Sequence, residues 1–155
     1  MVSPALSLLL LSLTTAAASS TLKMAPCNAS DPTQRWGFDL FDNSLHAGDA
    51  MDDNRTLDCG KCTNGSVPTL QPREAVKRDE EQVWTMIGVD HFRLSSDSTA
   101  GGCLAVDGSG GGIHLAVPCN ASSHRQSWAF INGSGTQGPN GLLASDSSAG
   151  CVSWK

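Results

Sequence analysis

The motif Gln-x-Trp occurs three times in this chain of 155 residues, at Gln34–Trp36, Gln82–Trp84 and Gln126–Trp128. The three glutamines are 48 and 44 residues apart. A second phrase repeats at nearly the same interval, as TLDC, CLAV and CVSW, beginning at Thr56, Cys103 and Cys151. A fixed period of this size indicates one supersecondary unit used three times, and one such unit cannot bury its apolar face alone. We therefore predict three units of about 45 residues that share one core.

The residues between the motifs favour an all-β fold. Short apolar stretches alternate with Gly, Ser, Asn and Asp, which is typical of strands joined by turns. In the third unit apolar residues alternate from Ile113 to Val117, and Trp128 and Phe130 fall on one face of a strand. The Gln-x-Trp tryptophans, Trp36, Trp84 and Trp128, are therefore predicted to lie in the core and not to form ligand platforms.

The first eighteen residues are predicted to be a cleaved secretion signal. The segment ALSLLLLSL, residues 5–13, is apolar but too short to span a bilayer, and Ala16 and Ala18 suit cleavage before Ser19. Residues 1–18 are thus assigned to the signal peptide and 19–155 to one secreted domain; the alternatives are an uncleaved anchor or a gene-model artefact. Five Asn-x-Ser/Thr sequons agree with export, and we predict glycosylation at Asn28, Asn54, Asn64, Asn120 and Asn132.

Charge and cysteine content narrow the classes of partner. The formal net charge of −5 argues against nucleic acid or an anionic membrane surface, and no segment is long enough for membrane insertion. Six cysteines in a secreted chain predict disulfides rather than metal ligands. Cys59 and Cys62, in CGKC, are predicted to pair locally, because a redox role would need a βαβ pattern and one CxxC is half a zinc site. No paired carboxylates or nucleophile–base constellation is recognisable, so no catalysis, cofactor or metal is expected.

The stretch CLAVDGSGGGIHLAVPCNASSHRQSWAF, residues 103–130, resembles a whole repeat of the ricin B-type lectins. Cys-Leu-x-Val, a Gly-rich turn, Pro-Cys and Gln-x-Trp follow one another in the order typical of that family. The resemblance implies a β-trefoil, in which three four-stranded units close around a pseudo-threefold axis. It also implies a disulfide between Cys103 and Cys119, because the family pairs these two positions.

The same resemblance leaves two cysteines without a partner in their own unit. Cys27 stands where the second cysteine of a pair belongs, and Cys151 stands where the first belongs. The two half-units belong together in a closed threefold fold, so we predict a Cys27–Cys151 disulfide and a circularly permuted trefoil. Residues 142–155 and 19–38 then share one lobe, here called the split unit. The alternative is a clipped fragment or a faulty gene model.

The resemblance also implies shallow sites for galactose-type and related sugars, up to one in each unit. Such a site takes an Asp two residues after the first cysteine position, polar and aromatic residues before the second, and the residue preceding Gln-x-Trp. The carboxylate accepts sugar hydroxyls, and the aromatic face covers the apolar side of the sugar ring. The second unit supplies Asp58, Gln71, Glu81 and Gln82 as candidates, but it has no aromatic residue between Cys59 and Gln82.

The other units match this site less well. Ala105 and Ser153 stand where the Asp should be in the third unit and the split unit, and neither unit has an aromatic residue at the platform position. Asp107 and His114 are a further candidate pair at the third unit's Gly-rich turn, although a turn Asp and an exposed His are the simpler interpretation. The charged segment REAVKRDEE, residues 73–81, is predicted to be a solvated loop, and the alternative is a surface that docks a partner.

We therefore predict a secreted, non-catalytic carbohydrate-binding module whose partners are glycans or glycoproteins carrying galactose-type or related sugars. Two alternatives stay open. The missing aromatic residues favour a trefoil that serves as an interaction or structural module without sugar affinity. The chain could also be the detached accessory domain of a secreted glycoside hydrolase.

Overall fold

The computed structural model describes residues 20–48, 54–73, 81–88, 93–96, 101–109, 111–131, 133, 140–147 and 150–154. The predicted signal peptide, the sequon at Asn132 and residues 74–80 of the charged segment lie outside the described residues. The described part contains the strands β1 (Ser20–Pro26), β2 (Arg35–Asp39), β3 (Ser44–Ala47), β4 (Arg55–Asp58), β5 (Thr69–Pro72), β6 (Trp84–Ile87), β7 (Arg93–Ser96), β8 (Cys103–Val106), β9 (Ile113–Ala116), β10 (Trp128–Ile131), β11 (Asn140–Ser145) and β12 (Gly150–Trp154). Two short 3₁₀ helices, η1 (Pro32–Gln34) and η2 (His124–Gln126), precede β2 and β10.

The strands pair in three equivalent sets. In the second unit the strand at the cysteine-motif position begins the antiparallel pair β4–β5, and the strand with the motif tryptophan begins the pair β6–β7. The corresponding pairs in the third unit are β8–β9 and β10–β11. The last strand of each unit then pairs with the first strand of the next, as β3–β4, β7–β8 and β11–β12. The second unit is thus β4–β7 and the third is β8–β11. The predicted all-β trefoil is confirmed.

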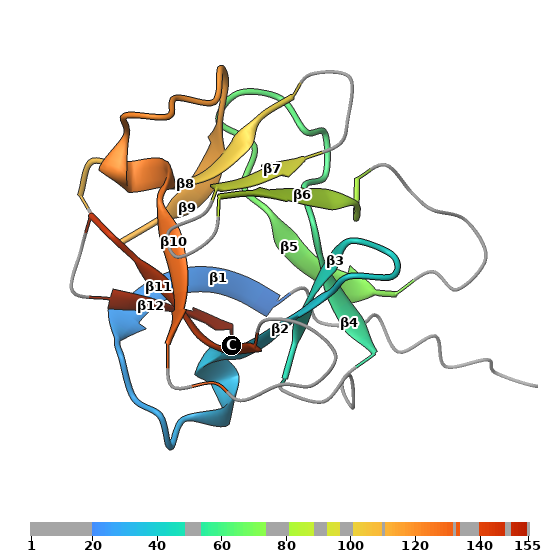
Figure 1. Cartoon of the computed structure of the whole chain (residues 1–155), viewed down its shortest axis with the longest axis vertical. Helices are drawn as coiled ribbons and strands as arrows, with labels where there is room; N and C mark the ends of the chain where they lie inside the picture. Colours follow the sequence, from blue (N-terminus) through green and yellow to red (C-terminus); the bar gives the residue numbers. More distant parts are fainter. Residues whose placement is uncertain are drawn as a thin grey trace, which may run out of the picture.

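The split unit is assembled from the two ends of the described chain, where β12 lies beside β1 (Figure 1). These strands are antiparallel, with Cys151 opposite Ala25, and β2–β3 completes the unit. In the other two units the equivalent pairs, β4–β5 and β8–β9, follow each other directly along the chain. A Cys27–Cys151 disulfide, with 4.9 Å between the Cα atoms, fastens the two ends. This is the connectivity expected of a circularly permuted trefoil.

The disulfides follow the same pseudo-symmetry. Cys103–Cys119, with 5.1 Å between the Cα atoms, occupies in the third unit the place of Cys27–Cys151 in the split unit. The second unit has Thr56 at the first cysteine position, and its hydroxyl donates to the Leu45 carbonyl at 3.0 Å instead. A third disulfide, Cys59–Cys62, closes the turn after β4, and both of its cysteines are buried. These are the three pairs predicted from the sequence.

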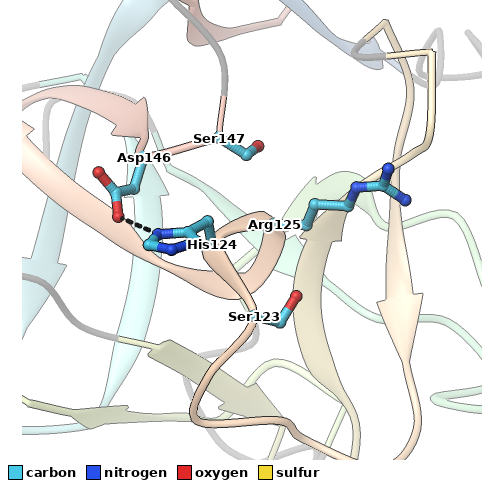
Figure 2. A pocket seen from close by; sticks show the side chains of 5 residues that line it. All are labelled: Ser123, His124, Arg125, Asp146 and Ser147. Carbon is cyan, nitrogen blue, oxygen red and sulfur yellow. Dashed lines mark hydrogen bonds and ion pairs between the residues drawn. The ribbon is translucent and has the colours of Figure 1, made fainter.

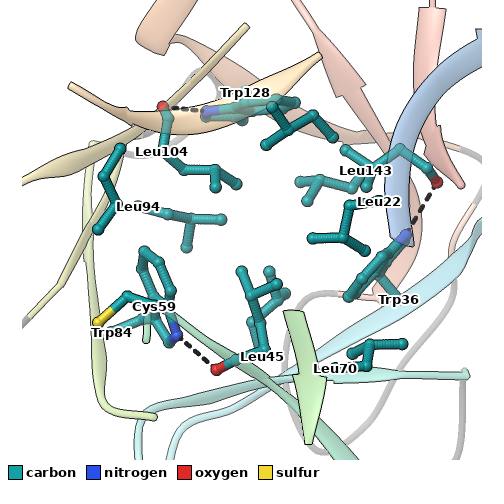
Figure 3. Close-up of a cluster of buried hydrophobic side chains, with 14 of the residues drawn as sticks. Leu22, Trp36, Leu45, Cys59, Leu70, Trp84, Leu94, Leu104, Trp128 and Leu143 are labelled. Atoms are coloured by element: carbon teal, nitrogen blue, oxygen red, sulfur yellow. Dashed lines mark hydrogen bonds between the residues drawn. The ribbon is translucent and has the colours of Figure 1, made fainter. Parts of the chain in front are cut away.

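The three Gln-x-Trp tryptophans form the centre of the core. Their side chains have no exposed surface, and they surround the buried leucines in Figure 3. Each indole Nε1 donates at 2.9 Å to a main-chain carbonyl at the same position of its unit, and Trp36, Trp84 and Trp128 take Val152, Leu57 and Leu104, respectively. Burying one such ring contributes about 4 to 6 kcal/mol of transfer free energy. The tryptophan therefore ties the two strand pairs of its unit together.

The glutamines of the motif hold the loop that precedes each 3₁₀ helix. The side-chain oxygen of Gln34 accepts from the Asn28 amide at 2.8 Å, and that of Gln126 accepts from the Asn120 amide at 2.7 Å. Gln34 also donates to the Pro26 carbonyl at 2.9 Å. The loop formed by the repeated phrase Pro-Cys-Asn-Ala-Ser is thus hydrogen-bonded to the glutamine that follows it. This bond fixes the position of the strand that carries the buried tryptophan.

Candidate functional site

The structure brings three of the four second-unit candidates together where β4 ends and β6 begins. Asp58 is the last residue of β4 and is 7% exposed. The side-chain nitrogen of Gln82 donates to Asp58 Oδ2 at 3.2 Å. The main-chain carbonyl of Glu81 accepts from the amide of Cys59, the residue after Asp58, at 2.9 Å. The main chain of half-buried Glu81 is therefore bonded to the residue that follows Asp58, at one edge of the unit.

Gln71 is connected to this group only indirectly. Its side-chain nitrogen donates to Thr69 Oγ1 at 3.1 Å, and Thr69 is the residue opposite Asp58 in the β4–β5 register. The sequence-based candidates do not include Thr69, because the length of the turn between β4 and β5 conceals the register. A threonine hydroxyl directly across the strand pair from Asp58 is the polar neighbour that the sequence analysis missed.

The Asp58 carboxylate is held in one orientation and keeps part of its hydrogen-bonding capacity. Oδ1 accepts from the Gly60 amide at 2.6 Å, while Oδ2 accepts from Gln82. Gly60 adopts a positive φ of 62° at the start of the turn that Cys59–Cys62 closes. A carboxylate offers about four acceptor positions, so about two remain for donors supplied by a ligand.

Gln82 positions Asp58. Its side chain also donates to the Pro72 carbonyl at 3.3 Å, as Gln34 does to the Pro26 carbonyl in the split unit. Gln82 is buried, with 9% of its surface exposed. Its amide therefore has the loop-holding role common to the Gln-x-Trp motif and the additional role of fixing a carboxylate.

Two positions, here called the rim positions, distinguish the units. The first is the place of Asp58, which Ser153 takes in the split unit and Ala105 takes in the third unit. The second is the residue directly before the motif glutamine, and it is Glu81, Thr33 or Arg125 in the second, split and third unit, respectively. The rim is therefore acidic in the second unit, hydroxylic in the split unit and basic in the third.

The rim of the split unit is satisfied internally. The Thr33 and Ser153 hydroxyl oxygens lie 2.9 Å apart and form a hydrogen bond. The Thr33 hydroxyl also donates to Asp31 Oδ1 at 2.7 Å, and the same oxygen accepts from the Thr33 amide at 2.9 Å to cap η1. Both rim hydroxyls are thus bound to the protein itself.

Asp107 and His114 have separate surroundings in the third unit. Asp107 Oδ1 accepts from the amide and the hydroxyl of Ser109, at 3.0 and 2.7 Å, and from the Gly111 amide at 3.2 Å. Oδ2 accepts from the Gly112 amide at 3.0 Å. These bonds, above all that from the Ser109 hydroxyl, hold the pKa of Asp107 below its ordinary value. Asp107 therefore organises the β8–β9 turn.

His114 lies on β9, opposite Ala105, and it is half-buried. No hydrogen bond joins it to Asp107 among the described residues. Arg125, at the second rim position, was not a sequence-based candidate although it directly precedes Gln126. Its distance from the Gly-rich turn is short, since an ideal Cβ placed on Gly108 would lie 3.6 Å from Arg125 Nη1.

The described residues contain no group of three His, Cys, Asp or Glu side chains placed to hold a metal ion. In the same part of the chain, no helix has the length and apolar character needed to cross a membrane.

Comparison with known proteins identifies the family. The model of the ricin-type β-trefoil lectin domain matches residues 5–130. No curated protein and no solved structure matches the chain significantly. The matched stretch ends within β10, and β11 and β12 complete the same trefoil. On the family match and the threefold core, this chain belongs to the ricin-type β-trefoil lectin domains, a family of generally non-catalytic carbohydrate-binding modules.

Proposed function

We propose that this protein is a secreted, non-catalytic lectin module that binds a neutral sugar of the galactose type, or a related one, at the second unit. The observation that carries the proposal is the Asp58 carboxylate, which Gly60 and Gln82 hold in place. A fixed carboxylate accepts two neighbouring sugar hydroxyls without first losing its own conformational freedom. We propose glycans or glycoproteins as the partners.

The charge of the second unit favours a neutral ligand. Asp58 and Glu81 belong to the same part of the unit, since the Glu81 carbonyl accepts from the amide of Cys59, and a carboxylate or sulfate on the sugar would meet like charges there. Thr69, opposite Asp58, offers a hydroxyl that both donates and accepts. Since no aromatic side chain lies between Cys59 and Gln82, stacking adds nothing from that segment, and we expect weak binding at a single site.

Secretion is supported by the three disulfides and by the exposed sequons. The asparagines at 28, 54, 64 and 120 are all exposed. At Asn64 the side-chain oxygen accepts from the Val117 amide at 3.0 Å, which leaves the nitrogen available for a glycan. We therefore propose N-glycosylation at these positions.

The missing aromatic platform favours one other function, an interaction module without sugar affinity. A glycan array followed by calorimetry separates the two functions. Asp58→Asn keeps the shape of the side chain and removes its charge, and we expect affinity for the bound neutral glycan to fall about tenfold to a hundredfold, since hydrogen bonds to charged groups contribute roughly 1.5 to 3 kcal/mol.

Ser153→Ala is the matched control, because Ser153 holds the same rim position in the split unit. We expect this variant to bind like the wild type. Binding that survives Asp58→Asn would remove the second unit from the proposal. A wild type that binds no glycan on the array would favour the interaction module.

A further inference from the structure

An open polar pocket of about 710 Å³ lies between η2 and the turn after β11, outside the second unit. It is lined by Ser123, His124, Arg125, Asp146 and Ser147 (Figure 2). Of these residues only Arg125 belongs to the rim positions defined above. The pocket therefore joins the third unit to the beginning of the split unit.

One wall of the pocket is fixed by a contact between a histidine and an aspartate. His124 Nδ1 lies 3.0 Å from Asp146 Oδ2. The amide of Asp146 donates to the Ser127 carbonyl at 3.0 Å, so the turn after β11 is attached to the end of η2. Asp146 Oδ2 is thereby occupied by His124 on this wall.

The opposite wall carries donors that the protein does not use. Arg125 is exposed, and its guanidinium has no hydrogen-bond or ion-pair partner among the described residues. Ser123 stands at the N-cap of η2, yet its hydroxyl makes no capping bond, whereas Asp31 caps η1 in the split unit. Figure 2 shows Arg125 on the side of the pocket away from the His124–Asp146 pair.

The charge here is the reverse of that in the second unit. Arg125 stands where the second unit has Glu81, and Ala105 stands where it has Asp58. The nearby acidic residue, Asp107, directs its carboxylate onto the amides of its own turn. Because the chain has a net charge of −5, general attraction of anions to the protein is not expected, and any affinity for anions must arise locally.

We propose that this pocket binds the acidic group, a carboxylate or a sulfate, of a glycan. Arg125 provides the charged contact, since a guanidinium donates two parallel hydrogen bonds to either group. Ser123, which lines the same pocket, provides a neutral donor. The inference rests on the proposed lectin function in taking a glycan as the ligand, but it uses no residue of the second-unit site.

The test uses oligosaccharides that differ only in one group: a sulfated form, a uronic-acid form and a neutral form of the same chain. Inorganic sulfate is the fourth ligand. Binding of each to the full protein is measured by calorimetry at constant ionic strength. We expect the wild type to bind at least one acidic form ten times or more tightly than the neutral form, and the better of the two identifies the acidic group.

Arg125→Gln should remove this preference. Lys61→Gln, which removes one exposed positive charge from the second unit, is the matched control and should keep it. Ser123→Ala should reduce the affinity for the acidic form by a smaller factor than Arg125→Gln. Circular dichroism and thermal unfolding check that each variant folds.

Three results would overturn the inference: no preference in the wild type, a preference that persists in Arg125→Gln, or an equal loss in Arg125→Gln and Lys61→Gln. Binding of inorganic sulfate without binding of either acidic glycan would also overturn it, as an adventitious ion only. Asp58→Asn separates the two proposals, because it should weaken binding of neutral sugars and leave the effect of Arg125→Gln unchanged.

Discussion

Removing the Cys27–Cys151 disulfide should destabilise the protein more than removing Cys103–Cys119, although the two bonds have equivalent places in the trefoil. Each joins the first strand of a unit to the loop that precedes a 3₁₀ helix. Cys103 and Cys151 are both fully buried, and the Cα–Cα distances are 5.1 and 4.9 Å. The packing lost at these two positions on replacement by alanine is therefore nearly the same; of their partners, Cys27 is exposed and Cys119 is half-buried, so packing alone favours a larger loss for the local pair.

The two bonds differ in the length of chain that they close. Cys27 and Cys151 are separated by 124 residues, and Cys103 and Cys119 by 16. In the chain-entropy model the longer loop is worth about 5 kcal/mol and the shorter about 3 kcal/mol. The double variant Cys27→Ala/Cys151→Ala should thus have a free energy of unfolding about 2 kcal/mol below that of Cys103→Ala/Cys119→Ala.

Urea unfolding followed by tryptophan fluorescence measures this difference, because the three motif tryptophans are buried in the native state. The comparison requires equal slopes of free energy against urea concentration in both variants. Equal losses of stability, or a larger loss for the local pair, would refute the reasoning that the bond between the chain ends acts through loop closure.

Three other predictions concern a turn, a buried histidine and a buried aspartate. An ideal Cβ on Gly112 lies 2.5 Å from Asp107 Oδ2, so Gly112→Ala should displace the carboxylate and lower the melting temperature by a few degrees, whereas Gly111→Ala, with no atom nearer than 3.9 Å, should not. Burial lowers the pKa of His46 from its ordinary 6.5, so the unfolded chain binds the proton more readily. Stability measured by urea unfolding should therefore fall as the pH drops from 7 to 5, and His46→Gln should flatten that fall. Burial raises the pKa of Asp39, but hydrogen bonds from a backbone amide and an arginine outweigh burial and lower it below its ordinary value of 3.8. The folded protein should therefore lose further stability in urea unfolding as the pH falls below about 3.8.

The core could be predicted from the sequence because its residues recur at fixed positions on the strands. A tryptophan two residues after each glutamine must face the same way in every unit, and the structure gives all three the same 2.9 Å bond to a carbonyl. The relation between Cys27 and Cys151 could be predicted for a similar reason, since each occupies half of a repeated pattern. Because the motifs repeat, equivalent positions of the three units can be compared from the sequence alone.

The candidate site could be predicted only in part, because it depends on register and turn geometry. The position of Asp58 follows from the cysteine motif, but the placement of Thr69 opposite it follows from the β4–β5 register. The turn between those strands has its own length and its own disulfide, so the spacing of the third unit does not transfer. Arg125 stands at a position that the family site uses, directly before Gln126, but it was not a candidate because Ala105 replaces the Asp of that site in the third unit.

The division between core and rim explains how one scaffold can carry different ligand chemistries. In every unit the motif tryptophan makes the same bond to a main-chain carbonyl, and the motif glutamine is also bonded to the main chain, so exchanging a rim residue leaves those bonds intact. The rim positions accordingly carry carboxylates in the second unit, hydroxyls in the split unit and a guanidinium in the third unit. Since the hydroxyls of Thr33 and Ser153 already bind each other, a ligand at the split unit would have to break that bond before forming its own. Ligand binding is therefore expected to concentrate on the second and third units, with opposite preferences for charge.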